Sequence, residues 1–149
     1  FSGSHGVQMP ADQRCAAFQD TCRRYHLEGR VFETEEAQFQ TMDYGDYIRQ
    51  VLERNPDADG IFASSDVIAA QVLQACAALG RRVPEDVQVI GFDDVPLARL
   101  TTPQLTTIRQ PIRQMSVYAI NAIQRQADQE GAPSRTVFPV TLECRASTR

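Results

Sequence analysis

The sequence predicts an α/β fold in which a mainly parallel sheet is flanked by helices. Short apolar runs alternate with helical patterns from Phe1 to Gly91, an order typical of right-handed βαβ units. The run Val87–Phe92 (VQVIGF) has the β-branched composition of a buried parallel strand, and the acidic pair Asp93-Asp94 follows it. A chain of 149 residues with 42% hydrophobic content can form one sizeable core, so a single domain is expected.

The first part of the chain contains two predicted helices between short strands. Apolar residues at three- and four-residue spacing predict helices over Pro10–Leu27 and Asp43–Arg54, and Pro10 suits a first helical turn. Phe1–Ser4 is predicted to end a strand. The next two predicted strands are Gly29–Phe32 and Asp59–Ala63.

The following helix has clear start and stop signals. Ser64, Ser65 and Asp66 are good amino-terminal capping residues, and Gly80 is a good carboxyl-terminal stop, so the helix is predicted from Val67 to Leu79. Capping alone could explain the polar residues before this helix. The rest of the chain is predicted as a strand over 87–91, a loop over 97–103, an extended segment over 106–109 and a helix over 112–128. Residues 136–144 alternate in character and are predicted as a closing strand or a bent pair, broken at Pro139.

The acidic pair Asp93-Asp94 is the main candidate for function. Ligands of open α/β sheets bind beyond the carboxyl ends of the strands, which is where this pair stands. Ionised side chains are rarely buried without a partner. From the residues alone, the two carboxylates could bind hydroxyl groups, bind a cation, accept a phosphoryl group or cap the loop.

Composition excludes several functions. A net charge of −4 argues against this chain itself gripping nucleic-acid phosphates. All fifteen basic residues are arginine, which excludes a lysine Schiff base and a P-loop lysine. No apolar run reaches the roughly 18–20 residues of a membrane span. The four cysteines lack metal-site spacing and suit a reducing cytoplasm, so we expect a cytoplasmic protein without a cofactor.

Three pieces of sequence carry a family resemblance. PEDVQVIGFDD, the loop VPLARLTTP and LTTIRQP follow one another over residues 84–111, and DGIFASSDVIAAQVLQACAALGRRVPEDV precedes them. Their order and spacing resemble the effector-binding domain of lactose-repressor-family (LacI/GalR) transcription regulators, specifically its C-terminal part. The resemblance implies a type I periplasmic-binding-protein-like fold and mainly one lobe of its clamshell. The chain carries no helix-turn-helix and no first half of that domain, and the resemblance places DNA binding in that separate helix-turn-helix.

The resemblance also implies site residues. Arg14 lies in RCAAF, which matches the family motif whose arginine contacts the effector, and Asp93 would accept hydrogen bonds from effector hydroxyls. Ser65 stands where many relatives carry an effector-contacting asparagine, and Gln110 would assist. Phe39 is the candidate for the aromatic residue that stacks on the ligand, although its register is one residue off.

Subdomains and a dimer interface follow from the same resemblance. Residues 1–109 would form the C-terminal subdomain, 110–135 a crossover and helix of the N-terminal subdomain, and 136–149 the return. In the family, the loop over 97–103 and part of the helix over 67–79 contact a second subunit. The residues expected in this homodimer interface are Ala69, Ala70, Leu73, Leu97 and Leu100.

We therefore expect the ligand-sensing and dimerisation part of a regulator whose effector is a small, sugar-like molecule. The resemblance implies no enzymatic activity. An alternative is a periplasmic sugar-binding protein of a transporter, which shares the clamshell architecture. An enzyme or phosphoacceptor using Asp93 and Asp94 is disfavoured, because no lysine is present and neither histidine lies in a catalytic motif.

Overall fold

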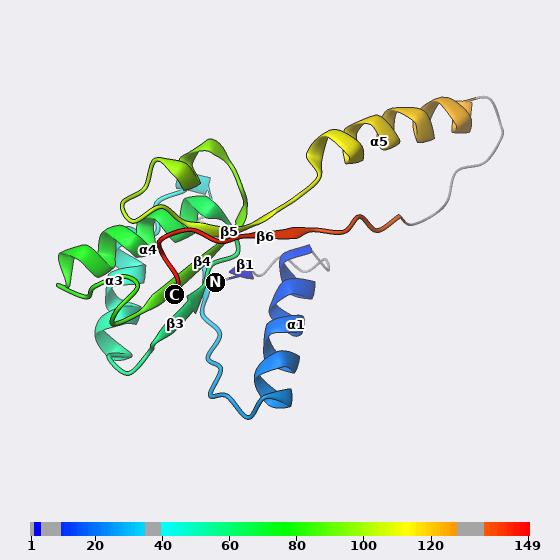
Figure 1. Cartoon of the computed structure of the whole chain (residues 1–149). Helices are drawn as coiled ribbons and strands as arrows, with labels where there is room; N and C mark the ends of the chain where they lie inside the picture. The colour runs from blue at the N-terminus through cyan, green and yellow to red at the C-terminus, as the bar shows by residue number, and fades with distance from the viewer. Residues whose placement is uncertain (1, 4–9, 35–39, 128–135) are drawn as a thin grey trace.

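The computed structural model describes residues 2–3, 10–34, 40–127 and 136–149, and its elements alternate between strand and helix (Figure 1). The α-helices are α1 (Pro10–Arg24), α3 (Gly45–Arg54), α4 (Asp66–Ala78) and α5 (Ile112–Ala127), and a short 3₁₀-helix, η1, covers Pro96–Arg99. The strands are β1 (Ser2–Gly3), β2 (Glu33–Thr34), β3 (Gly60–Phe62), β4 (Gln88–Asp93), β5 (Thr106–Arg109) and β6 (Thr141–Glu143).

The main sheet confirms the predicted fold class. Its strand order is β3-β4-β5-β6, with β3, β4 and β5 parallel and β6 antiparallel to β5. The pair β1-β2 is also parallel but forms a separate two-stranded sheet. In β4–β5 pairing, Asp93 stands opposite Arg109, so the end of one strand lies beside the end of the next.

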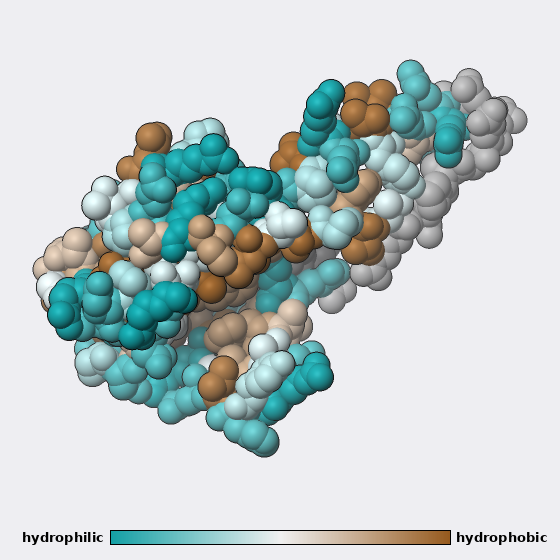
Figure 2. Space-filling view, in the orientation of Figure 1, coloured by the Kyte–Doolittle hydropathy of each residue, from teal (hydrophilic) through white to brown (hydrophobic). Residues whose placement is uncertain are grey.

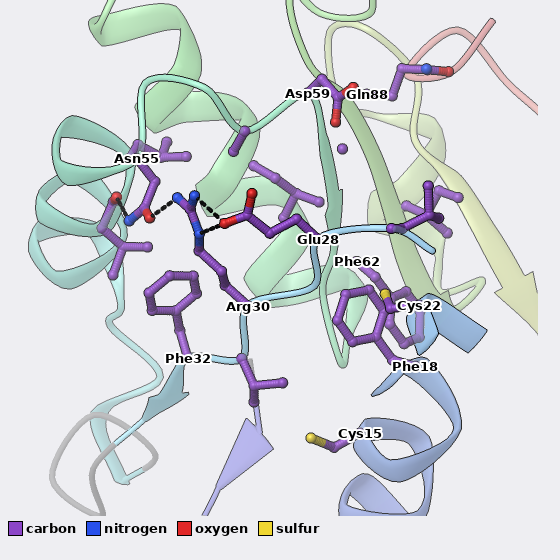
Figure 3. A pocket seen from close by; sticks show the side chains of 18 of the residues that line it. Cys15, Phe18, Cys22, Glu28, Arg30, Phe32, Asn55, Asp59, Phe62 and Gln88 are labelled. Atoms are coloured by element: carbon purple, nitrogen blue, oxygen red, sulfur yellow. Dashed lines mark hydrogen bonds and ion pairs between the residues drawn. The ribbon is translucent and has the colours of Figure 1, made fainter. Parts of the chain in front are cut away.

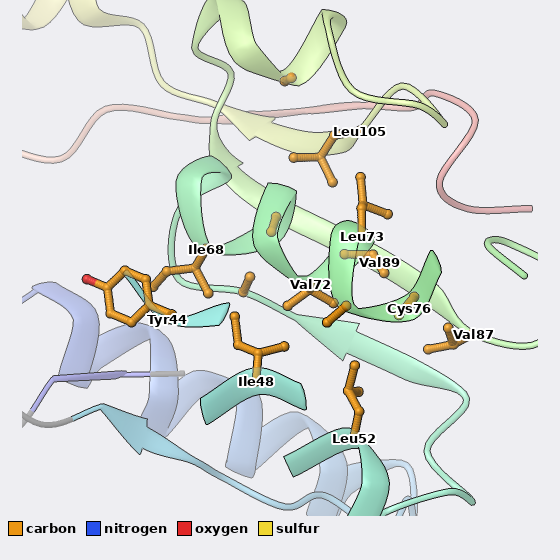
Figure 4. Close-up of a cluster of buried hydrophobic side chains, with 14 residues drawn as sticks. Tyr44, Ile48, Leu52, Ile68, Val72, Leu73, Cys76, Val87, Val89 and Leu105 are labelled. Atoms are coloured by element: carbon orange, nitrogen blue, oxygen red, sulfur yellow. The ribbon is translucent and has the colours of Figure 1, made fainter. Parts of the chain in front are cut away.

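The core lies between the sheet and the helices α3 and α4. Ile48 on α3, Val72 and Cys76 on α4 and Val89 on β4 are fully buried and face one another across it (Figure 4). Burying side chains of this size contributes about 1.5–3 kcal/mol each relative to leaving them exposed. This half of the chain is therefore a stable platform for the loops at the strand ends.

Helix α4 begins and ends where its sequence signals place it. The Ser65 side chain accepts a hydrogen bond from the Ile68 N–H at 3.3 Å, which satisfies one of the free amides of the first turn. Gly80 has φ +69, and the Arg81 N–H donates to the Cys76 carbonyl at 2.9 Å, as in a Schellman motif. The start of the helix is thereby fixed beneath the strand ends.

The C-terminal segment fastens the sheet together. Ser147 is fully buried, and its hydroxyl donates to the Val89 carbonyl at 2.6 Å and accepts from the Thr106 N–H at 2.8 Å. These two bonds connect β4 to β5 through a single side chain. They satisfy polar groups that would otherwise be costly to bury.

The strand predicted over Gly29–Phe32 was wrong in position, because the structure places β2 at Glu33–Thr34. Gly29 lies so close to α1 that a Cβ on it would stand 2.6 Å from the Cys22 sulfur. Arg30 is bound by ion pairs to Glu28 and Asp57. Packing on α1 and pairing of charges thus hold this segment in an irregular path, and the strand begins after it.

Helix α5 stands away from the rest of the molecule. Strand β5 leads out to it and β6 leads back, so that α5 forms an arm that these two strands connect to the body of the molecule (Figure 1). Hydrophobic side chains lie on the surface of this arm (Figure 2), and Ile112 is 55% and Ile123 67% exposed. Tyr118 packs edge-on against Phe138 with ring centroids 5.5 Å apart, which links the helix to the returning segment.

Candidate functional site

The last residue of β4, Asp93, and the residue after it, Asp94, carry two carboxylates in an unusual backbone conformation. Asp93 has a backbone φ of 118 and Asp94 one of 54. Positive φ values favour glycine, and among the other residues they are commonest for asparagine and aspartate. With two consecutive positive φ values, the backbone directs the two carboxylates to different partners. Asp93 accepts a hydrogen bond from the Gln110 side chain at 2.7 Å, whereas Asp94 accepts one from Arg109 at 2.6 Å.

Arg14 approaches the same strand end from α1. Its guanidinium lies over the Phe92 ring, 4.2 Å from the centroid, in a cation–π contact. Its Nε is buried and has no hydrogen-bond partner within the described part of the chain. A guanidinium with unused donors beside a carboxylate suits a polar ligand that can both donate and accept hydrogen bonds.

Burial shifts the proton affinities of both charged groups. Desolvation lowers the pKa of the Arg14 guanidinium, and the charge of Asp93 opposes this shift. Desolvation raises the pKa of the Asp93 carboxyl, while the Gln110 hydrogen bond and the charge of Arg14 pull it down. The two groups are incompletely compensated by the chain itself, as is common where a ligand completes a site.

Asp66 supports this turn from below. It is fully buried, accepts from the Thr107 hydroxyl at 2.5 Å and accepts from the Val95 N–H at 2.9 Å. It therefore connects the start of α4 to β5 and to the residue that follows the acidic pair. Desolvation raises the pKa of Asp66, and these two hydrogen bonds act against that increase.

Three of the five predicted ligand residues are brought together. Arg14, Asp93 and Gln110 are linked by the interactions described above. The hydroxyl of Ser65 instead caps α4, as the capping interpretation allowed. Phe39 lies outside the described residues. Sequence reasoning missed Phe92 as the support of Arg14, although its place between Gly91 and Asp93 at a strand end was a usable signal.

A cavity of about 710 Å³ adjoins this site beneath α1. Phe18 and Cys22 border it on the α1 side, and Arg30 lies on the other side (Figure 3). Phe62 also lines it. Arg14 also lines it, but Asp93 and Gln110 do not. Because the carboxylate and amide lie outside this largely apolar cavity, we place the candidate site at the strand ends and treat the cavity as a gap under α1.

The residues predicted for the dimer interface fall into two groups. Leu100 is 78% exposed, and Ala70 and Leu97 are half-buried, so these three are accessible to a second chain. Ala69 and Leu73, by contrast, belong to the hydrophobic core of this chain. That part of the prediction requires correction, because both side chains pack inward against the sheet and do not form a surface.

The described residues contain neither a metal-binding cluster nor a membrane-spanning helix. Within 2–3, 10–34, 40–127 and 136–149, no group of three or more His, Cys, Asp or Glu side chains could hold a metal ion. Over the same residues, no helix has the length and apolar character needed to cross a membrane.

Comparison with known proteins assigns the fold to a family. The profile of the periplasmic binding protein-like domain matches residues 1–148. The chain belongs to this family. The chain is 34% identical to a ribose operon repressor of Halalkalibacterium halodurans over 152 residues, which cover 99% of the chain and 44% of that repressor. It is 36% identical over 115 residues to the transcriptional regulator CelR of Thermobifida fusca, covering 71% of the chain and 34% of CelR.

Solved structures of LacI-type regulators have the same fold as this chain. A LacI family transcriptional regulator from Arthrobacter sp. FB24 in complex with lactose aligns with a TM-score of 0.80 and 29% identity over 99% of this chain and 55% of that chain. A CelR–cellobiose complex aligns with a TM-score of 0.80 and 30% identity over 98% of this chain and 46% of that one. The resemblance to lactose-repressor-type regulators is confirmed. The chain spans about half the length of these family members or less, and they are regulators, not enzymes.

Proposed function

We propose that the chain is the effector-sensing part of a LacI-type transcription regulator. The observation that carries this proposal is the convergence of Arg14, Asp93 and Gln110 beyond the end of β4, in a chain whose relatives regulate transcription. The Arthrobacter regulator and CelR were solved with lactose and cellobiose, which supports a sugar or a related polyhydroxylated molecule as the effector.

Each residue has a distinct role in the proposed site. Asp93 accepts hydrogen bonds from sugar hydroxyls with the oxygen that Gln110 leaves free, and Gln110 fixes the orientation of the carboxylate. Arg14 donates to hydroxyls from the opposite side, on the support of the Phe92 ring. Ser65 at the start of α4 adds a polar contact, and Phe39 provides the stacking ring. No covalent chemistry is involved, so the protein acts by binding.

The arm belongs to a second lobe in this proposal. Residues 1–109 and 136–149 form the C-terminal subdomain, and residues 110–135 cross to the N-terminal subdomain, where the exposed stripe of α5 packs. Effector binding between the lobes closes them, and closure changes the spacing of DNA-binding heads in a homodimer. Leu97, Leu100 and Ala70 lie in the dimer interface.

The remaining parts of the proposal concern the whole regulator. DNA is contacted only through a helix-turn-helix outside this chain, the protein acts in the cytoplasm without a membrane or cofactor, and it has no enzymatic activity. The alternative of a periplasmic sugar-binding protein of a transporter is weaker, because the relatives named above are regulators.

A thermal-shift screen tests the effector site. A full-length regulator containing this chain is screened with D-ribose, lactose and cellobiose, alongside the variant Asp93→Asn. We expect one sugar to raise the melting temperature of the wild type, because ligands that bind only the folded state stabilise it. The shift disappears in Asp93→Asn. Asp46→Asn, an exposed helix position, is the matched control and retains the shift.

The screen can contradict the proposal in two ways. A full shift that persists in Asp93→Asn places the effector elsewhere. Absence of a shift with any of these sugars rejects the effector class that the relatives support. Isothermal titration of residues 1–149 alone is expected to give much weaker binding than the full-length regulator, because only one lobe contributes contacts.

A further inference from the structure

Asp94 is a buried anion at the meeting point of three strands. Its side chain is only 3% exposed, yet it accepts hydrogen bonds from Arg109 at 2.6 Å and from Arg145 at 2.5 Å. The guanidinium of Arg99 on η1 lies 3.8 Å away. Arg109 also pairs with Glu143 at 2.9 Å, which adds a second connection between β5 and β6.

The two closest arginines stand on the two connections between the body and the arm. Arg109 is the last residue of β5, which leads out to α5, and Arg145 follows β6, which leads back (Figure 1). β5 and β6 are paired antiparallel, with Arg109 opposite Thr141. One carboxylate therefore holds the outgoing and the returning segment at the same point.

The Asp94 carboxylate neutralises the buried positive charge of Arg145. Arg145 is only 11% exposed, and its other NH group donates to the Leu105 carbonyl at 2.7 Å. Burial raises the pKa of Asp94, but the hydrogen bonds from Arg145 and Arg109 outweigh it and hold the pKa below its ordinary value. The group is thus ionised at neutral pH. Neutralising Asp94 would leave a buried guanidinium without its anion, which is costly.

Asp94 is also coupled to the proposed effector site through adjacent residues. Asp94 binds Arg109, and the preceding Asp93 binds Gln110, the residue after Arg109. Because neighbouring residues of an extended chain point to opposite sides, these two contacts hold the end of β5 from both faces. Any movement of Arg109 relative to Asp94 shifts Gln110 relative to Asp93.

We infer that Asp94 is a positioning residue that fastens both connections to the arm and thereby holds Gln110 against the effector carboxylate Asp93. The effector part of this inference rests on the proposed function. The fastening of the two connections does not, because it follows from the contacts of Asp94 alone. Asp94 does not touch the ligand and acts through Arg109 and Arg145.

Hydrogen exchange tests the fastening in the full-length regulator. In Asp94→Asn, the amides of β5 and β6 exchange faster by about tenfold or more, a change that requires only ~1.4 kcal/mol of lost local stability. The amides of α4 remain protected, and Asp94→Glu, which keeps the charge, recovers part of the protection. Asp46→Asn serves as the matched control and changes neither strand.

A second variant guards against loss of folding. If Asp94→Asn also exposes α4, Arg109→Gln is used, because Arg109 is half-exposed and its loss leaves Arg145 on Asp94. Exchange should then accelerate in β5 and much less in β6. Unchanged exchange in both strands, for either folded variant, overturns the inference. So does an Asp94→Glu variant that behaves like Asp94→Asn, since a charge-independent effect is structural only.

Effector affinity provides the second readout. Titration of D-ribose, lactose and cellobiose should show about tenfold weaker binding to Asp94→Asn than to the wild type, or ~1.4 kcal/mol, although every proposed contact residue is present. Unchanged affinity rejects the link to Gln110. If the wild type binds none of the three sugars, the proposed function fails, and hydrogen exchange alone still decides whether Asp94 fastens the strands.

Discussion

Gly91 lies where β4 packs closely against α4 and the segment before β5. A Cβ at this position would lie 2.3 Å from the Asp66 carboxylate and 2.8 Å from the Leu105 side chain. We expect Gly91→Ala to lower the free energy of unfolding by about 3 kcal/mol, as overpacking of a rigid core does. Urea denaturation measures this change. Gly60→Ala is the control and should be close to neutral, because nothing lies within 4 Å of a Cβ there.

Individual residues also show what the sequence could not predict. The position of Asp93 at a strand end could be predicted, because an acidic pair directly after an apolar run marks the point where a buried strand leaves the core. The role of Asp94 could not, because its partner Arg145 lies 51 residues away and meets it only once β6 has paired with β5. Contacts between segments so distant in sequence leave no local pattern.

At the scale of elements, Asp66 joins α4, the turn after β4 and β5 through one buried carboxylate. Desolvation raises its pKa above the ordinary value, so the folded state binds a proton more readily than the unfolded state. The stabilisation that protonated Asp66 provides is therefore fully present below the ordinary pKa of aspartate. It is lost as the pH rises through the raised pKa of the folded state. We expect the wild type to lose stability relative to Asp66→Asn over that interval.

Paired urea titrations of the two proteins across pH 3–8 check this sign, since about 3.9 is the ordinary pKa of Asp. The asparagine amide can accept from the Val95 N–H and donate to the Thr107 oxygen, so the variant retains both contacts. A stability difference that does not vary with pH, or one that moves in the opposite direction, would contradict the raised pKa.

Elements with strong local signals were predicted well, and those fixed by packing were not. Helix α4 begins directly after its serine cap, Ser65, and ends just before Gly80, as the sequence indicated. The strand expected over Gly29–Phe32 was displaced, because close contact with Cys22 and the ion pairs of Arg30 determine the path there. Likewise, inward-facing Ala69 and outward-facing Ala70 are neighbours on one helix, and composition could not distinguish them.

At the scale of the whole molecule, the arm exposes an apolar stripe that other protein surfaces can cover. We expect residues 1–149 to self-associate through Ile112 and Ile123, because exposed apolar stripes of this kind drive association. Analytical ultracentrifugation of the double variant Ile112→Gln/Ile123→Gln should give a lower average mass than the wild type, leaving only the association of the 16.6 kDa chain through Leu97, Leu100 and Ala70. The matched control is Tyr25→Gln/Leu27→Gln, which alters exposed apolar residues outside the arm. An average mass that is unchanged in the arm variant would show that α5 makes no contribution to self-association.

The antiparallel pairing of β5 with β6 shows where α5 can be deleted by protein engineering. Arg109 and Thr141 stand directly opposite each other, so the chain leaves the body along β5 and returns to it along β6 at the same point. A two-residue hairpin turn such as Asn-Gly can therefore join Arg109 directly to Thr141 and replace the segment between them. The body would then become a smaller domain that retains Arg14, Asp93 and Asp94 and lacks α5.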